Sequence, residues 1–287
     1  MIIGAGRSGT TSLYHLLAAH DKVCYSKVKE VPYFSIDDLF GRGEVFFHSF
    51  FRKCKGASVT ITADTYLLMD HDAVSRVYAY NPEMKIIVIL RDPVARAYSS
   101  YHYSVNNGHH GAYRDFLDSI EEEKNIRQVP DIVRRNNFGH FYGSLYYEHL
   151  SRWASVFPRD QILPLRTRDL SETPTDFSSK LFAFLNLHDP GIPVKKYNTA
   201  AVPRNMKLER FFIDRDHVLR KVIRKITPGF IKRTVVGSGM VDRLHEANRK
   251  EQGNQPISPE QESEARRYFM KDLQLLKDEF QVDLIHS

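Results

Sequence analysis

The residues most suited to chemistry lie at the start of the chain, in Gly4-Ala5-Gly6-Arg7-Ser8-Gly9-Thr10-Thr11-Ser12, between two apolar segments. We interpret this segment as a strand, a glycine-rich turn and a helix that starts near Thr10. Glycines allow a tight turn that brings backbone N–H groups close to a ligand, and the positive end of a helix dipole favours an anion there. Side-chain donors are added by one guanidinium and three hydroxyls: Arg7, Ser8, Thr10 and Thr11. The segment therefore has the composition of a phosphate-binding loop.

This loop departs from the Walker A pattern at one informative position. The pattern requires Gly4-x-x-x-x-Gly9 to be followed by lysine and then by serine or threonine, but Thr10 stands where the lysine belongs. The loop's only cation is Arg7, three residues earlier. A magnesium-dependent nucleotide hydrolase or kinase would lack its main contact to the β- and γ-phosphates, so the sequence predicts a different anion. The alternative is a plain strand-to-helix turn whose glycines serve only geometry.

Further polar residues follow predicted strands. Lys29 and Glu30 come after the short strand Val23–Tyr25, and we expect them on a loop because Pro32 disfavours regular structure. The segment Asp64-Thr65-Tyr66 follows the β-branched strand Ser58–Thr62. A third strand, Lys85–Leu90, is apolar on both faces, as is typical of a central parallel strand.

That third strand runs into Arg91, after which Asp92 and Pro93 suit the N-cap and first position of a helix carrying Ser99. Strands alternate with helices from Met1 to about Leu165, which predicts an α/β fold with a central parallel sheet flanked by helices. Ligands of such sheets bind outside the carboxyl ends of the strands. The phosphate-binding loop, the Lys29–Glu30 pair, Asp64 and Arg91 all fall at those ends, so we expect a single site.

The rest of the chain carries weaker signals. We expect a strand over Gln161–Leu165 and helices over Phe141–Phe157, Pro174–Leu187 and Pro259–Phe280. The polar stretch Glu121–Asn137 is expected to be mobile and exposed. We expect Lys195–Arg210 to form a basic loop and Arg215–Arg233 a basic amphipathic stretch. A solvated helix face is the default interpretation of Arg220–Arg233, the alternative being a surface for an anionic polymer or a membrane. No internal repeat or convincing linker is present, so residues 1–287 are predicted to form a single domain.

Composition narrows the class of partner. With 42% hydrophobic and 26% charged residues, the chain can bury a sizeable core. Its net charge of +6 favours an anionic ligand, but no nucleic-acid reader motif is present. The sequence contains no apolar run of about 18 residues that would span a membrane, and from the strand-like residues at Met1 we expect no signal peptide. We expect a cytoplasmic protein, the alternative being a truncated lumenal domain of a membrane-anchored enzyme.

The two cysteines, Cys24 and Cys54, form neither a metal-ligand spacing nor a disulfide framework. We expect both to be reduced core residues, the alternative being a bridge between them.

With these motifs in view, the sequence resembles the sulfotransferases that use 3′-phosphoadenosine 5′-phosphosulfate (PAPS). It is most similar to their carbohydrate branch, the heparan sulfate N- and 3-O-sulfotransferases and their bacterial relatives, from Ile2 to Leu284. The loop matches that family's 5′-phosphosulfate loop. Three further matches are the 3′-phosphate motif Leu90-Arg91-Asp92-Pro93-x-x-Arg96-x-x-Ser99, the glutamate-base segment Lys29-Glu30-Val31-Pro32-Tyr33-Phe34, and a later helix–strand unit from Tyr146 to Leu163.

The resemblance implies a P-loop-like fold and transfer of a sulfuryl group from PAPS to a hydroxyl or amine of a glycan or glycoconjugate. Adenosine 3′,5′-bisphosphate (PAP) would be the product, and no metal would be needed. Arg7 would stabilise charge on the leaving group, and Glu30 would take the proton of the acceptor. The residues expected to bind the nucleotide are Arg7, Ser8, Gly9, Thr10, Thr11, Ser12, Arg91, Ser99 and Arg204.

Several assignments stay open at this stage. Glu30 is either the base or part of a solvated pair with Lys29, in which case His102, His109 or His110 would be the base. Asp64 and Tyr66 either touch the acceptor or cap the next turn, and His102 and His109 are further candidates for the acceptor site.

The resemblance also has departures. The heparan-modifying enzymes usually carry lysine where this chain has Arg7, whereas other carbohydrate sulfotransferases carry arginine. The 3-O branch has a lysine at the position of Asp64, which argues against a heparan-like acceptor. Two competing functions are a nucleotide kinase, which would need the missing lysine and magnesium, and a nucleotide-binding module without catalysis.

Overall fold

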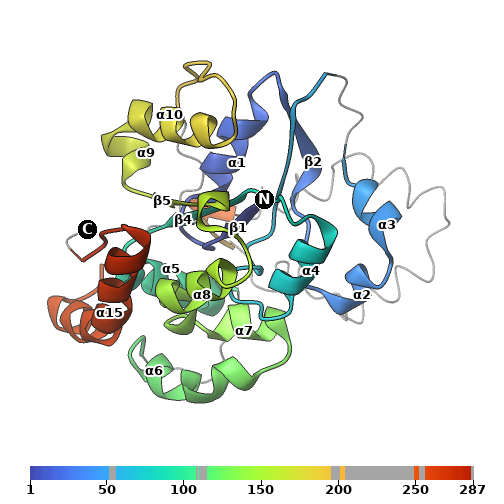
Figure 1. Cartoon of the computed structure of the whole chain (residues 1–287). Coiled ribbons are helices and arrows are strands. Elements are labelled where there is room, and N and C mark those ends of the chain that lie inside the picture. Colours follow the sequence, from blue (N-terminus) through green and yellow to red (C-terminus); the bar gives the residue numbers. More distant parts are fainter. Residues whose placement is uncertain are drawn as a thin grey trace. The chain divides into compact units, whose positions relative to one another are not determined.

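Five parallel strands form the central sheet, in the order β2-β3-β1-β4-β5 (Figure 1). In chain order they are β1 (Ile2–Gly4), β2 (Val23–Glu30), β3 (Val59–Ala63), β4 (Ile86–Leu90) and β5 (Ile162–Arg166). Every residue of β4 is at most 1% exposed, because this strand has neighbours on both edges and helices over both faces. The predicted α/β fold with a central parallel sheet is confirmed.

The computed structural model describes residues 1–51, 56–107, 109, 115–194, 201–203, 249–251 and 256–285. The chain divides into two units. The larger contains the parallel sheet and comprises Met1–Ser100, Asp115–Asn198 and Ile257–Ser287. The smaller comprises Tyr101–Arg114 and Thr199–Pro256, and it contains an antiparallel pair, β6 (Ala201–Pro203) and β7 (Arg249–Glu251). The boundary falls within α5 (Pro93–Asn106). The single domain over residues 1–287 stays a prediction.

Helices cover both faces of the parallel sheet (Figure 1). On one face, α1 (Thr10–Ala18) and α10 (Pro174–Phe184) pack on the sheet through a shared apolar core. That core includes Leu13, Leu17, Ile61, Ile87, Leu163 and Phe182. The other face carries the start of α5 and α8 (Tyr146–Ala154), against which α15 (Pro259–Phe280) packs. Asp272 of α15 accepts the N–H groups of Tyr147 and Glu148 and so caps the start of α8.

Short helices complete the larger unit. They are α2 (Asp37–Phe40), α3 (Glu44–His48), α4 (Ala73–Tyr80), α6 (Asp118–Glu122), η1 (Glu123–Gln128), α7 (Ile132–Phe138), η2 (Tyr142–Ser144), η3 (Arg159–Gln161) and α9 (Asp169–Glu172).

The expectation for residues 121–137 is confirmed only in part. This stretch folds into α6, η1 and α7, and most of its charged side chains are exposed as expected, but two are buried. Glu123 is 3% exposed and accepts the backbone N–H groups of residues 140, 141 and 142. Arg135 is 5% exposed and donates to the carbonyls of Met69 and Val129. The polar composition misled the prediction because these charges satisfy buried backbone groups instead of facing water.

Two other expectations are also corrected. Lys29 and Glu30 lie at the end of β2 and not on a loop, because the strand continues to Glu30 before Pro32 interrupts it. Cys24 is 4% exposed and is disulfide-bonded, so the expectation that it is reduced is wrong. Cys54 lies outside the described residues, as does the basic stretch Arg215–Arg233.

Candidate active site

Every strand of the parallel sheet ends at a residue with polar chemistry. The phosphate-binding loop follows β1, and Glu30 is the last residue of β2. Asp64 follows β3, Arg91 follows β4, and Thr167 follows β5. Because the five strands are parallel, these carboxyl ends meet at one edge of the sheet. The sequence prediction named the first four positions and missed the fifth.

The loop itself ends at a helix start that suits an anion. Gly9 is the N-cap of α1, no side chain caps this helix, and its first turn contains no acidic residue. The φ of Gly9 is 98°, and a Cβ there would meet Leu170 Cδ1 at 3.3 Å, so the position requires glycine. The start of α1 is therefore available to an anion through its N–H groups and its dipole.

Burial divides the predicted loop residues into two groups. The partly exposed members are Gly6, Arg7, Gly9 and Thr11, and the buried members are Ser8, Thr10 and Ser12. We expect direct ligand contacts from the first group and support of the loop from the second.

The two parts of the predicted nucleotide site adjoin one another. Arg7, which adopts a left-handed φ of 70°, donates from Nε to Ser99 Oγ at 3.2 Å. Arg91 directs Nη1 toward the Arg7 carbonyl at 3.4 Å. The fold thus brings together three predicted phosphate ligands, Arg7, Arg91 and Ser99, which come from two separate sequence motifs.

Arg96, from the same helix as Ser99, supports the loop from beneath. It is 2% exposed, and it donates from Nε to the Gly6 carbonyl at 3.1 Å and from Nη1 to the His140 carbonyl at 2.9 Å. A buried guanidinium with these carbonyl partners fixes the backbone of the loop.

Thr167 is a functional candidate that sequence reasoning missed. Its Oγ1 lies 2.6 Å from the Ser8 carbonyl and 3.0 Å from the Leu90 carbonyl, and its N–H donates to Leu90 at 2.7 Å. One side chain therefore ties the phosphate-binding loop to the strand that carries Arg91. The signal was present in the sequence, since Thr167 follows the predicted strand Gln161–Leu165 in the way that Arg91 follows its own.

Tyr146 is a second missed candidate. It is fully buried, and its hydroxyl lies beside the Ser8 side chain and the Arg91 backbone. Burial raises the pKa of this phenol to about 12, so Tyr146 is neutral at working pH.

Glu30 lies close to the loop through one intermediate residue. Its Oε2 accepts the Thr65 N–H at 2.9 Å, and its Oε1 contacts Lys29 Nζ. Thr65 in turn lies beside the loop, since a Cβ built on Gly6 would lie 3.8 Å from the Thr65 side chain. The Glu30 side chain is 42% exposed and Lys29 20%. The candidate base is therefore held by a backbone donor while remaining accessible to solvent.

Asp64 and Tyr66 belong to the same turn. Asp64 is 3% exposed, and its carboxylate accepts the Ser35 hydroxyl at 2.5 Å and the Tyr66 N–H at 3.0 Å. Burial raises the pKa of Asp64 to about 7, and the nearby carboxylates Glu30 and Asp70 add to this rise. This burial favours the turn-capping interpretation of Asp64, while Tyr66 is partly exposed.

The predicted histidines are placed in the smaller unit. His102 and His109 are both partly buried, and burial lowers the pKa of each imidazole. Their roles stay predictions. Arg204 and His110 lie outside the described residues.

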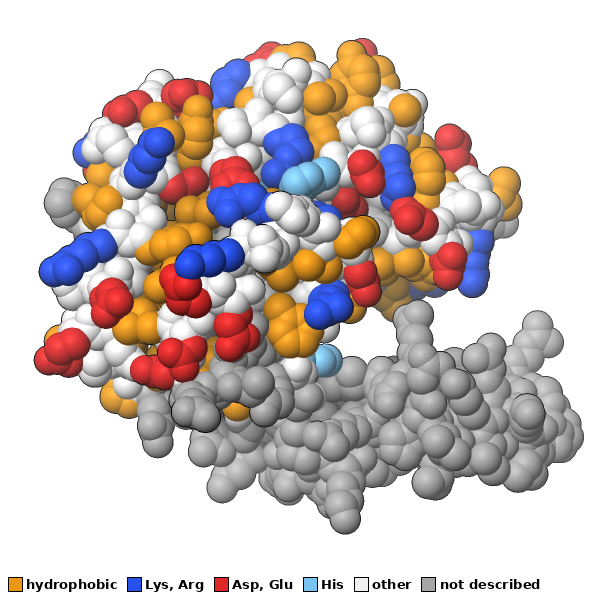
Figure 2. Space-filling view, turned by 90° about the horizontal axis from the view of Figure 1, so that it is seen from below, with side chains coloured by type: hydrophobic (Ala, Val, Ile, Leu, Met, Phe, Trp, Pro, Cys, Tyr) orange, Lys and Arg blue, Asp and Glu red, His pale blue; other side chains and the backbone are white. Residues whose placement is uncertain are grey.

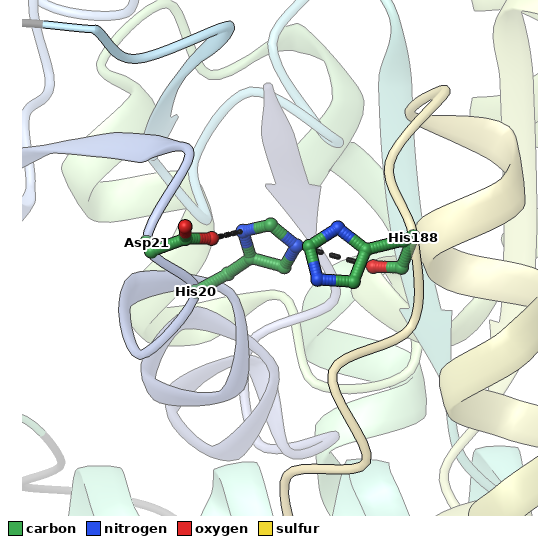
Figure 3. A group of neighbouring side chains, drawn as sticks. All are labelled: His20, Asp21 and His188. Atoms are coloured by element: carbon green, nitrogen blue, oxygen red, sulfur yellow. Dashed lines mark hydrogen bonds and ion pairs between the residues drawn. The ribbon is translucent and has the colours of Figure 1, made fainter.

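One group of metal-type ligands occurs among the described residues: His20, Asp21 and His188 (Figure 3). Nε2 of His20 lies 3.1 Å from the His188 carbonyl, and Nδ1 accepts the Lys22 N–H at 3.0 Å. Because both ring nitrogens serve backbone groups, a metal would have to break one of these bonds. The group joins the turn after α1 to the segment after α10, at the end of α1 opposite the phosphate-binding loop.

Comparisons with known proteins identify the family and the fold of the chain. The sequence model for the sulfotransferase domain matches residues 1–237. The solved structure of a sulfotransferase from Alicyclobacillus acidocaldarius superposes with a TM-score of 0.66 at 20% identity, covering 99% of this chain and 94% of that one. At this identity the likeness establishes the fold.

Curated relatives are similar over about two thirds of the chain. The membrane-associated sulfotransferase kil1 of Dictyostelium discoideum is 22% identical, with 66% of this chain and 56% of the relative covered. Human heparan sulfate glucosamine 3-O-sulfotransferase 5 is 24% identical, with 65% and 53% covered. Rat carbohydrate sulfotransferase 15 is 25% identical, with 65% and 43% covered. The chain thus spans about half the length of the curated relatives it matches.

Proposed function

The chain belongs to the sulfotransferase domain family, and on this premise we propose that it transfers the sulfuryl group of PAPS to a hydroxyl or amine of an acceptor. One observation carries the proposal. The turn that holds Glu30 lies beside the same loop whose Arg7 reaches Ser99. A candidate base, an anion-binding helix start and a second set of phosphate ligands thus lie at one edge of the sheet.

The residues present suit the anionic groups of PAPS in charge and in hydrogen-bond donors. The phosphate-binding loop would hold the 5′-phosphosulfate against the uncapped start of α1, with Arg7 beside it. Arg91 and Ser99 would hold the 3′-phosphate. Thr167 and Arg96 would keep the two subsites in register, since each bonds a loop carbonyl.

The chemistry assigned to these side chains is a single displacement. The acceptor oxygen or nitrogen forms a bond to sulfur while the bond between sulfur and the bridging oxygen of the 5′-phosphate breaks. Glu30 takes the acceptor's proton. Arg7 stabilises the negative charge that develops on the bridging oxygen, and it acts electrostatically because a guanidinium keeps its protons at working pH.

A carbohydrate is the proposed acceptor class. The relatives named above include a heparan sulfate glucosamine 3-O-sulfotransferase and a carbohydrate sulfotransferase. A polymer-binding basic field is not part of the proposal, since acidic and basic side chains are interspersed over the described part of the face in Figure 2. Nucleic acid is accordingly not proposed as a partner.

The location of the protein is a separate proposal. Among the described residues, no helix combines the length and apolar character needed to cross a bilayer. The disulfide at Cys24 favours the lumenal alternative over the cytoplasmic one, because disulfides persist in oxidising compartments.

Incubation with PAPS carrying labelled sulfate and a panel of glycans, lipids and small phenols tests the function. We expect label transfer to a glycan without added metal. We also expect PAP to raise the melting temperature without metal. At 100 times its dissociation constant, PAP should add about 2.7 kcal/mol to the free energy of unfolding. PAP binding without any transfer would indicate a binding module, and a shift with Mg-ATP alone would indicate a kinase.

A further inference from the structure

Asp64 is a buried carboxylate that the proposed chemistry does not use. It is 3% exposed, and among the described residues no Lys, Arg or His side chain forms an ion pair with it. Burying a carboxylate without a cation is costly. The free-energy cost of burying the Asp64 carboxylate near the candidate base indicates that this side chain has a function.

The bonds of Asp64 all converge on one turn. Its Oδ1 accepts the Tyr66 N–H, its Oδ2 accepts the Ser35 hydroxyl, and its own N–H donates to the Ile2 carbonyl of β1 at 3.0 Å. The turn over residues 64–66 is thereby fixed to the central strand on one side and to the segment after β2 on the other.

The same turn holds the candidate base. Between the Asp64 and Tyr66 amides lies the Thr65 N–H, which donates to Glu30 Oε2 at 2.9 Å. The Thr65 side chain also lies beside Gly6 of the phosphate-binding loop. The orientation of the Thr65 amide therefore decides where the half-exposed Glu30 carboxylate lies relative to the loop.

We propose that Asp64, braced by Ser35, is a positioning residue that fixes this turn so that the Thr65 N–H keeps Glu30 beside the phosphate-binding loop. The inference rests on the proposed function in assigning Glu30 as the base. Asp64 itself needs no contact with the nucleotide or the acceptor. Its carboxylate acts through the backbone N–H of Tyr66, the residue next to Thr65.

A pH-dependent signature accompanies this role. Ser35 and the Tyr66 N–H bond the Asp64 carboxylate, and the charged groups near it are Glu30 of β2 and Asp70 of the following turn. Both neighbours are acidic, and burial already raises the pKa of Asp64 to about 7. Loss of its proton changes the hydrogen bond with Ser35 and adds a negative charge beside Glu30. Turnover should therefore carry an ionisation near pH 7 that belongs to Asp64.

The test compares Asp64→Ala, Asp64→Asn and Ser35→Ala with a matched control, Asp70→Ala. Asp70 is also buried, at 6% exposed, and its carboxylate accepts a backbone N–H from Asp72 and not from residues 64–66. Because its charge contributes to the raised pKa of Asp64, Asp70→Ala is the control for kcat at a fixed pH and for exchange, and not for the pH profile. Three quantities are measured: turnover against pH, the dissociation constant for PAP, and hydrogen exchange of the peptide that contains Thr65 and Tyr66.

We expect Asp64→Ala to lower kcat on the order of 10- to 100-fold, because small misplacements of a catalytic group have such effects, while PAP affinity changes less than about twofold. Ser35→Ala should lower kcat less, and Asp64→Asn should recover most of the loss but remove the ionisation near pH 7. Exchange of the Thr65 peptide should accelerate in Asp64→Ala and not in Asp70→Ala.

Equal losses of kcat in Asp64→Ala and Asp70→Ala, or a parallel loss of PAP affinity, would show a purely structural role and overturn the inference. Should Asp64→Ala fail to fold, Ser35→Ala decides the question by the same measurements. Absence of sulfuryl transfer by the unaltered protein would refute the proposed function instead. Unchanged exchange of the Thr65 peptide would then separately refute the positioning by Asp64.

Discussion

Replacing Glu30 by glutamine separates catalysis from structure at the candidate base. Glutamine keeps the length of the side chain and an oxygen that accepts the Thr65 N–H, but it cannot take a proton. The substitution removes the ion pair with Lys29. The Lys29 side chain is 20% exposed and that of Glu30 42%, and ion pairs open to solvent contribute about 0–1 kcal/mol to the free energy of unfolding. Loss of general-base catalysis lowers turnover by about 10²–10⁴-fold, equivalent to roughly 3–5 kcal/mol. The expected effect on rate thus far exceeds the expected effect on stability.

The assay is turnover of labelled PAPS at saturating acceptor, with PAP affinity and melting temperature measured on the same samples. We expect PAP affinity and melting temperature of Glu30→Gln to remain close to the unaltered values. Lys29→Met is the matched control, because it removes the same ion pair and leaves the base in place. Near-normal turnover in Glu30→Gln would refute the assignment and transfer it to His102, His109 or His110. An equal loss in Lys29→Met would show that the ion pair, and not proton transfer, limits the rate.

Three further predictions address the nucleotide site and pH. Arg91→Ala should weaken PAP binding about tenfold or more, since charged hydrogen bonds contribute about 1.5–3 kcal/mol; calorimetry should find adenosine 5′-phosphosulfate, which lacks the 3′-phosphate, unaffected. Thr167→Val should weaken PAP binding about 5- to 10-fold, because it removes the side-chain hydrogen bonds to the Ser8 and Leu90 carbonyls. Thr167→Ser should restore the affinity. Equal affinities of the two variants for PAP would show that the Thr167 hydroxyl does not hold the two subsites together. Because the pKa of Asp64 is raised to about 7, the folded chain holds more protons than the unfolded chain between about pH 4 and 7. Stability from this group is therefore present at low pH and lost as pH rises to 7, and Asp64→Asn should melt higher than the unaltered protein at pH 8 but not at pH 5.

The sequence alone determined the main architecture, because its signals are local. The strand Lys85–Leu90 is continuously apolar, and a sheet buried on both faces requires such a run. The helix Pro259–Phe280 was predicted with the bounds that the structure has, since Ser258 caps its start and Pro259 is its first residue. In the same way, Asp92 does accept the Ala95 N–H at the start of α5. Parallel strands also dictate that their carboxyl ends share one edge, so the location of the site followed from connectivity.

Only the tertiary structure decided which side chains meet and which charges are buried. Glu123 and Arg135 read as surface residues, because nothing in their sequence neighbourhood reveals the backbone groups that they satisfy from other segments. The link from Ser35 through Asp64 to the Glu30 turn joins three segments up to 35 residues apart. Such contacts depend on strand order and register, which hydrophobic periodicity does not encode. The residue types therefore indicated the chemistry at this edge of the sheet, whereas long-range packing set its geometry.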